Sequence, residues 1–138
     1  MKKFWLLAIL IICGCRNFSA FNESVSKQYL LLLHNKERCK NQLDQLTENQ
    51  KLNSLAQKHA EWMADKSSLV HSNLRANTEF MYMGENIARG QPDENIVLAD
   101  WMKSSGHRQN ILNDHYKHVG IGYAKRDNMP YWCVIFAD

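Results

Sequence analysis

The residues best suited to chemistry gather in one stretch, residues 101–124 of a chain of 138 residues. Gly106 lies where an α-helix commonly ends in a residue of left-handed conformation, so we predict that a helix ends there. His107, Arg108 and Asn110 would then lie on the turn that follows. Polar side chains on a turn held between two rigid elements are candidates for binding or catalysis, and an imidazole among them can bind a metal ion.

Two further histidines follow, His115 and His118, with the spacing H-x-x-H. Together with His107 they form an alternative set of metal ligands, although the three straddle a turn and the start of a strand. The sequence patterns G-x-S-x-G and H-E-x-x-H, typical of hydrolases, do not occur, and neither does a phosphate-binding glycine loop. Ser104 and Ser105 precede His107, but adjacency in sequence does not place a base next to a hydroxyl. The sequence therefore indicates no nucleophile for covalent catalysis.

The segment 119–124 alternates as a β-strand does, with large apolar residues on one face and small residues on the other. Because the small face is almost free of side chains, we expect another element to pack closely against it. A turn over 125–130 should lead to a second strand over 131–137, which is apolar on both faces and is therefore expected in the centre of the sheet. The large residues of the first strand are Val119, Ile121 and Tyr123, and the small ones are Gly120, Gly122 and Ala124.

Helical periodicity predicts a first helix over residues 24–40. His34, Asn35 and Arg38 near its end are interpreted as part of a polar helix face. Together the predicted elements indicate the fold class α+β. The other predicted elements lie between this helix and the last two strands. They are a helix from a capping box at 47–50 to about Lys66, a loop over 67–76, a strand over 78–83, and a helix from Pro92 to Gly106. We expect His59 to be packed in the apolar stripe of the first of these helices.

The N-terminus is typical of an export signal, with Lys2 and Lys3 before an apolar run over 4–12 that is too short to span a bilayer. The run ends in I-C-G-C, which resembles a bacterial lipobox, so we predict that Cys15 is the lipidated first residue of the mature protein. The alternatives are an ordinary signal peptide and an uncleaved anchor. The predicted division of the chain is a lipoprotein signal peptide over 1–14, a tether over 15–23 and one folded domain over 24–138.

The charge of the chain is small. Its formal net charge of +3 would fall to +1 on removal of Lys2 and Lys3 with the signal. A net charge this small does not favour a nucleic-acid partner. The acyl chains on Cys15 make the membrane the one partner that the sequence indicates. We expect a monomer.

Two cysteines, Cys39 and Cys133, remain in the predicted domain. A pair of cysteines in an exported protein is a candidate disulfide. A bond would require the end of the first helix to touch the last strand. Two buried free thiols are the alternative.

Five short motifs occur in an order that resembles the CAP superfamily, which includes cysteine-rich secretory proteins, venom allergens, plant pathogenesis-related proteins and small bacterial exported proteins. The resemblance covers residues 29–138. It implies a three-layer α-β-α sandwich in which helices flank a small antiparallel sheet. The motifs are His34-Asn35-x-x-Arg38, His71-Ser72, Gly84-Glu85-Asn86-Ile87, Trp101 followed by Gly106-His107-Arg108-x-Asn110-Ile111-Leu112, and His118-Val119-Gly120-Ile121-Gly122.

The resemblance also implies a central cleft lined by two histidines and two acidic residues, which in some members holds a divalent metal. Matched motif to motif, the histidines fall on His71 and His107 and the first acidic residue on Glu85. The second is expected on the helix after Trp101, where Ser104 takes its place, so the set is incomplete. Two imidazoles and a carboxylate can bind zinc with positions left open for water. The same side chains can instead form a hydrogen-bonded network that holds loops on the core.

Two functions remain. In the first, the domain is a non-enzymatic binding or interaction module, held outside the cytoplasm on a bacterial membrane, that recognises a lipid, a glycan or a protein. In the second, it is a metal-assisted hydrolase that uses His71, Glu85 and His107, with zinc on the two histidines. The incomplete set and the missing nucleophile favour the binding module.

Overall fold

The computed structural model describes residues 6–74 and 79–138. The strands in this part of the chain form one sheet with the order β1-β3-β4-β2. As its doubly apolar sequence predicts, β4 lies inside the sheet, antiparallel to both of its neighbours. The elements are α1 (Leu6–Lys40), β1 (Thr47–Glu48), α2 (Gln50–Lys66), β2 (Met83–Arg89), α3 (Glu94–Lys103), α4 (Ser105–Ile111), β3 (His118–Arg126) and β4 (Met129–Ala137).

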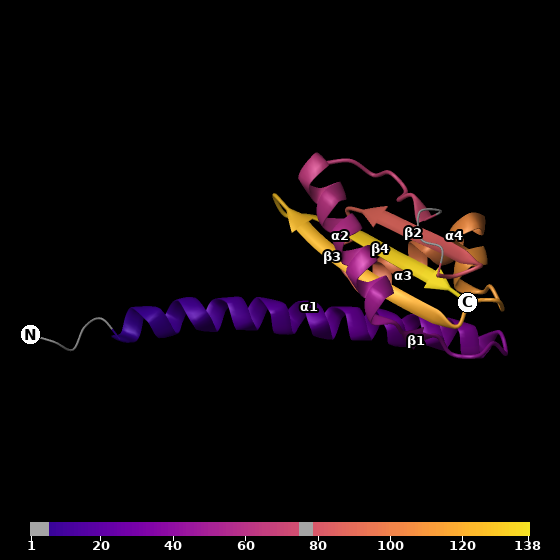
Figure 1. Cartoon of the computed structure of the whole chain (residues 1–138), viewed down its shortest axis with the longest axis horizontal. Coiled ribbons are helices and arrows are strands. Elements are labelled where there is room, and N and C mark those ends of the chain that lie inside the picture. Colours follow the sequence, from indigo (N-terminus) through magenta and orange to yellow (C-terminus); the bar gives the residue numbers. More distant parts are fainter. Residues whose placement is uncertain (1–5, 75–78) are drawn as a thin grey trace, which may run out of the picture.

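Helices cover both faces of the sheet, with α2 in front and α3 behind in the view of Figure 1. Successive β4 side chains enter different cores: Trp132 packs in the core shared with α1, α3 and α4, and Cys133 in the core shared with α2. The expected α+β, three-layer α-β-α sandwich is therefore confirmed. The sheet is mixed rather than purely antiparallel, because the short β1 pairs with β3 in the parallel direction.

The expected close approach to the small face of β3 is also confirmed, and α2 is the element that makes it. A Cβ built on Gly120 would lie 2.0 Å from the carbonyl carbon of Leu52, and one on Gly122 would lie 2.2 Å from that of Ala56. Real Cβ atoms do not approach so closely. The two glycines therefore let the backbone of α2 rest directly on the backbone of β3.

The hairpin between β3 and β4 turns through two residues, Asp127 and Asn128, both with positive φ (49° and 64°). Such turns match the right-handed twist of the paired strands, and Asp and Asn tolerate the left-handed conformation better than most residues. The turn is shorter than the predicted 125–130, because pairing continues to Arg126 and Met129.

The helix that was predicted to end at Gly106 ends earlier. α3 stops at Lys103, and the extended backbone of Ser104 (φ −86°, ψ 124°) separates it from α4. Gly106 lies within α4 and does not act as a left-handed stop. The polar residues predicted on a turn after it therefore lie on a short helix.

Two other boundaries differ from their predictions. Thr47 and Glu48 form β1, and Asn49 caps α2 instead, its side chain accepting from the backbone N–H groups of Lys51 and Leu52. The strand predicted over 78–83 is not confirmed: β2 begins at Met83, and residue 78 lies outside the described residues.

α1 runs without interruption from Leu6 to Lys40, so the predicted tether over 15–23 is helical here. In Figure 1 its N-terminal half extends well beyond the sheet. Nowhere in residues 22–74 and 79–138, whose side chains the structure describes, does a helix carry an apolar run long enough to cross a membrane.

The polar residues near the end of α1 are buried, so their interpretation as a polar face was wrong. His34 is fully buried, with its ring between those of Trp101 and Phe136. The guanidinium of Arg38, also buried, ties α1 to two loops. It donates to the backbone carbonyls of Asp44 (2.7 Å), Ile111 (2.9 Å), Asn113 (2.8 Å) and Tyr116 (3.1 Å).

The predicted disulfide is wrong. Cys39 and Cys133 are both free thiols, the first exposed and the second buried. The reason is the layer arrangement: Cys39 lies on α1, whereas the side chain of Cys133 faces α2 from the opposite side of the sheet.

Candidate functional site

Glu85 on β2 is the centre of the candidate site. Its side chain is only 3% exposed. One carboxylate oxygen accepts from Nδ1 of His71 (2.7 Å) and from the backbone N–H of Ser72 (2.9 Å). The other accepts from the Ser72 hydroxyl (2.5 Å) and from the thiol of Cys133 (3.6 Å). The predicted contact between His71 and Glu85 is therefore present.

These four donors match the number of lone-pair positions on a carboxylate. Burial and the charge of Glu85 raise the pKa of the Cys133 thiol well above its usual value, which keeps it protonated and able to donate. A buried carboxylate is costly unless hydrogen bonds compensate it, and here the compensation is complete. Glu85 thus fastens the loop that follows α2 to the sheet.

His71 lies at the edge of this arrangement, with 60% of its side chain exposed. Because Nδ1 is engaged by the carboxylate, Nε2 is the ring nitrogen that remains for another partner. A carboxylate that orients a histidine in this way is common behind metal ligands.

His107 on α4 is half-buried, and its ring is tilted against that of Trp101 at a centroid distance of 6.4 Å. Burial lowers the pKa of His107, and the nearby charge of His71 lowers it further. His107 is joined to β2 through its backbone: its carbonyl accepts a hydrogen bond from Nδ2 of Asn86 (3.0 Å).

Two asparagines join α4 to β2. Nδ2 of Asn110 donates to the carbonyl of Glu85 (3.2 Å) and to Oδ1 of Asn86 (2.9 Å). This contact needs a glycine at position 84, because a Cβ there would lie 2.8 Å from Oδ1 of Asn110. From the sequence, Asn110 was placed among the candidates for binding or catalysis and Asn86 was noted only as part of the G-E-N motif, so the structural role of both was missed.

The remaining predicted positions do not complete a metal centre. Ser104 lies at the junction of α3 and α4, and its side chain makes no capping bond. The alternative histidine set does not converge: His115 stacks on Tyr82, and His118 contacts the hydroxyl of Thr47 at 2.9 Å. His59 has the one satisfied nitrogen that was predicted, with Nε2 2.7 Å from the carbonyl of Val70, but it is only partly buried and stacks on the exposed Trp62 rather than packing in the core.

A catalytic zinc site normally has three protein ligands. Among the side chains that the structure describes, in residues 22–74 and 79–138, no three of His, Cys, Asp or Glu are placed to hold a metal together. His71 and His107 are the two residues that offer a ring nitrogen, and Glu85 is committed to its four donors. The residues present therefore do not fit a hydrolytic zinc centre.

Comparison with known proteins agrees with this architecture. The model of the cysteine-rich secretory protein family, CAP, matches residues 31–136. The chain belongs to the CAP family. The protein YkwD of Bacillus subtilis is 34% identical over an alignment of 112 residues, and the match covers 74% of this chain and 44% of YkwD. The chain thus spans less than half the length of this relative.

Solved CAP structures share the fold. An outer surface protein of Borrelia burgdorferi superposes with a TM-score of 0.74 at 21% identity, over 80% of this chain and 90% of that one. An extracellular protein of Bacillus anthracis with an SCP domain gives 0.71 at 27% identity, over 83% and 40%. A structure of NaASP2 with Zn²⁺ gives 0.63 at 14% identity, over 80% and 78%, so some proteins of this fold do bind zinc.

Proposed function

We propose that this CAP-domain protein works outside the cytoplasm, is held to a bacterial membrane through a lipid on Cys15, and binds a lipid, a glycan or a protein without catalysing a reaction on it. The location is supported by similar proteins described as an outer surface protein and as an extracellular protein. The anchor is supported by the I-C-G-C motif that ends at Cys15.

The observation that carries the binding function is the saturation of Glu85. A general base needs a lone pair free for the proton that it accepts, and a metal ligand needs one free for the ion. All four positions on Glu85 face donors of the chain itself. The carboxylate therefore has a structural role. It holds the loop after α2 on the sheet, and we infer that this loop is the part of the domain that contacts a ligand.

That loop has the composition of a recognition surface. Leu69 and Val70, next to His71, are about half exposed (47% and 51%), and Met81 is 81% exposed where the chain enters β2. Leu69 and Val70 are consecutive in the chain, and neighbouring exposed apolar side chains of this kind often mark an interaction site. The hydrolase alternative has weaker support, since Ser104 stands where a second carboxylate would be needed.

The substitution Glu85→Gln separates the two functions. If Glu85 is structural, the NH₂ group of the glutamine faces the donors that the carboxylate oxygen accepted from, and those donors lose their acceptor. We then expect the free energy of unfolding to fall by about 2–3 kcal/mol. Urea denaturation of the full-length chain in detergent measures this. Glu37→Gln, at a surface pair with Lys40, is the matched control and should change stability by less than about 0.5 kcal/mol.

The same samples test for a metal. We expect EDTA and added zinc to leave the melting temperature of the parent unchanged, because the described residues hold no three-ligand site. Zinc-dependent hydrolysis of p-nitrophenyl acetate that disappears in His71→Ala, with Glu85→Gln as stable as the parent, would establish the hydrolase instead.

A further inference from the structure

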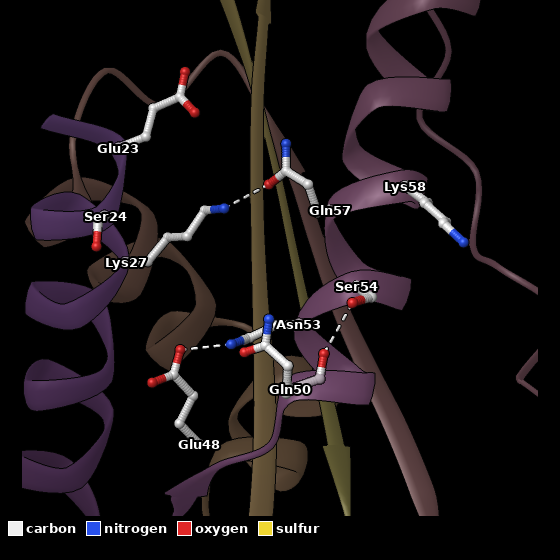
Figure 2. A pocket seen from close by; sticks show the side chains of 9 residues that line it. All are labelled: Glu23, Ser24, Lys27, Glu48, Gln50, Asn53, Ser54, Gln57 and Lys58. Carbon is white, nitrogen blue, oxygen red and sulfur yellow. Dashed lines mark hydrogen bonds between the residues drawn. The ribbon is translucent and has the colours of Figure 1, made fainter. Parts of the chain in front are cut away.

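A groove of about 460 Å³ lies between α1 and α2, beside the outer edge of β3 (Figure 2). Its volume falls in the range of sites that bind small ligands, but such sites usually have mostly apolar walls. Here every residue that lines the groove has a polar or charged side chain. The groove therefore offers a ligand hydrogen bonds and charges rather than an apolar surface.

Two carboxamides of α2 form the inner side of the groove, next to β3. Oδ1 of Asn53 accepts from the backbone N–H of Ile121 (2.9 Å), and its Nδ2 donates to the carboxylate of Glu48 (2.5 Å). Oε1 of Gln57 accepts from the N–H of Tyr123 (3.1 Å), and its Nε2 donates to the carbonyl of the same residue (2.9 Å). An extended peptide that paired with this edge would have to displace both amides. The groove therefore does not favour a peptide that binds as an added strand.

Other polar groups of the groove have hydrogen-bonding capacity to spare. Lys27 donates one of its three ammonium protons to Oε1 of Gln57 (2.6 Å), and Figure 2 shows it reaching across from α1. Only one carboxylate oxygen of Glu48 is used by the amide of α2. Within the described residues, the side chains of Glu23 and Gln50 have no hydrogen-bond partner. Both walls thus present groups that a ligand can engage.

The charges of the groove cancel. Lys27 and Lys58 supply two positive charges, and Glu23 and Glu48 supply two negative ones. An anionic ligand would meet the carboxylates, a cationic ligand would meet the ammonium groups, and an acyl chain would find no apolar wall. A neutral ligand rich in hydroxyl groups fits instead, because each hydroxyl both donates and accepts hydrogen bonds.

We propose that the groove between α1 and α2 binds a neutral glycan, whose hydroxyl groups bond to Glu23, Lys27, Glu48 and Gln50. The carboxylates accept from hydroxyls, the ammonium group donates to sugar oxygens, and the carboxamide of Gln50 does both. This selects the glycan among the three classes of ligand considered above, so it rests on the proposed binding function. The site is separate from the loop after α2, because it lies along the first half of that helix.

Neutral trisaccharides test the site by nuclear magnetic resonance of the backbone amides of the full-length chain, in a detergent without a sugar headgroup. We expect chitotriose or maltotriose, at millimolar concentration, to shift the signals of residues 23–27 and 48–57 in a saturable way. Trigalacturonate has three sugar rings but carries carboxylates, and it should not shift them. The absence of shifts around the groove with both neutral sugars would overturn the proposal. Stronger binding of trigalacturonate would also contradict it.

The variant Glu23→Ala/Gln50→Ala tests the residues. Neither side chain has a partner within the described residues, so the fold should be kept while the dissociation constant rises at least about tenfold. Glu37→Ala/Gln28→Ala is the matched control, since it removes the same two residue types from α1 outside the groove, and it should bind like the parent. An unchanged dissociation constant in the groove variant would mean that the sugar binds elsewhere.

Failure of the glycan site is distinguishable from failure of the proposed function. The test of the proposed function with Glu85→Gln measures the stability of a contact on β2, which does not line the groove. Trisaccharides that leave the groove signals unshifted, together with the expected loss of stability in Glu85→Gln, would reject the glycan site alone.

Discussion

At the scale of single residues, buried polar groups of this protein connect separate elements of the fold through hydrogen bonds. Glu85 collects donors from the loop after α2 and from β4, and Arg38 reaches carbonyls in two loops. His34 differs, because its Nδ1 lies 2.8 Å from the Leu30 carbonyl while Nε2, also buried, has no hydrogen-bond partner. A ring in that position is stable only when neutral. Burial accordingly lowers the pKa of His34 from 6.5 to about 4.

This shift predicts a loss of stability in acid. Between pH 6.5 and about 4 the unfolded chain binds a proton at His34 that the folded chain does not, so the contribution of the neutral ring is complete above pH 6.5 and is lost as the pH falls. The loss should approach about 3 kcal/mol at pH 4. His34→Phe keeps an aromatic ring between Trp101 and Phe136 but cannot titrate.

Urea denaturation of parent and His34→Phe at several pH values measures the effect. The difference in unfolding free energy between the two should be constant from pH 7 to 8 and should shift in favour of the variant below pH 6.5. Parallel curves across the whole range would show that His34 is not buried as a neutral ring.

At the scale of elements, the contact of α2 with β3 determines how the layers fit. Gly122→Ala would place a Cβ 2.2 Å from the backbone of Ala56, and backbone cannot move aside as a flexible side chain does. We expect this substitution to lower the free energy of unfolding by about 3 kcal/mol or more. Thermal and urea denaturation give the value.

Gly106→Ala is the matched control on another element. Gly106 lies in α4 with no atom within 4 Å of a Cβ built on it, so alanine should fit and favour the helix by about 0.5–1 kcal/mol. Equal effects of the two substitutions would mean that α2 does not rest on β3 as described.

At the scale of the whole molecule, the remaining prediction concerns the anchor. We expect the parent to fractionate with membranes and Cys15→Ala to move to the soluble fraction, because several acyl chains on one residue bind a bilayer firmly. Membrane fractionation and mass spectrometry of the N-terminal peptide measure partition and acylation together. Cys13→Ala is the control and should stay on the membrane. Loss of acylation without any change in partition would point to an anchor other than a lipid.

Local patterns in the sequence were enough for much of the architecture. The alternation over 119–124 predicted both the strand and its bare face, and the doubly apolar run over 131–137 predicted a central strand. Periodicity of this kind depends on near neighbours in the chain. Helix and strand ends were less predictable, because the side chain of Asn49 caps α2 in place of the expected Thr47, and Ser104 ends α3 through an extended backbone conformation that several sequences allow.

The sequence by itself therefore determined the order of the elements, the family motifs and the residues from which a site is built. Only the tertiary structure decided what those residues do. Glu85 meets His71, Ser72 and Cys133 because register and face bring two distant segments to one carboxylate. The same two properties placed Cys39 beyond the reach of Cys133. They also aligned Asn53 with a strand edge, a contact between residues 68 positions apart that no local pattern encodes.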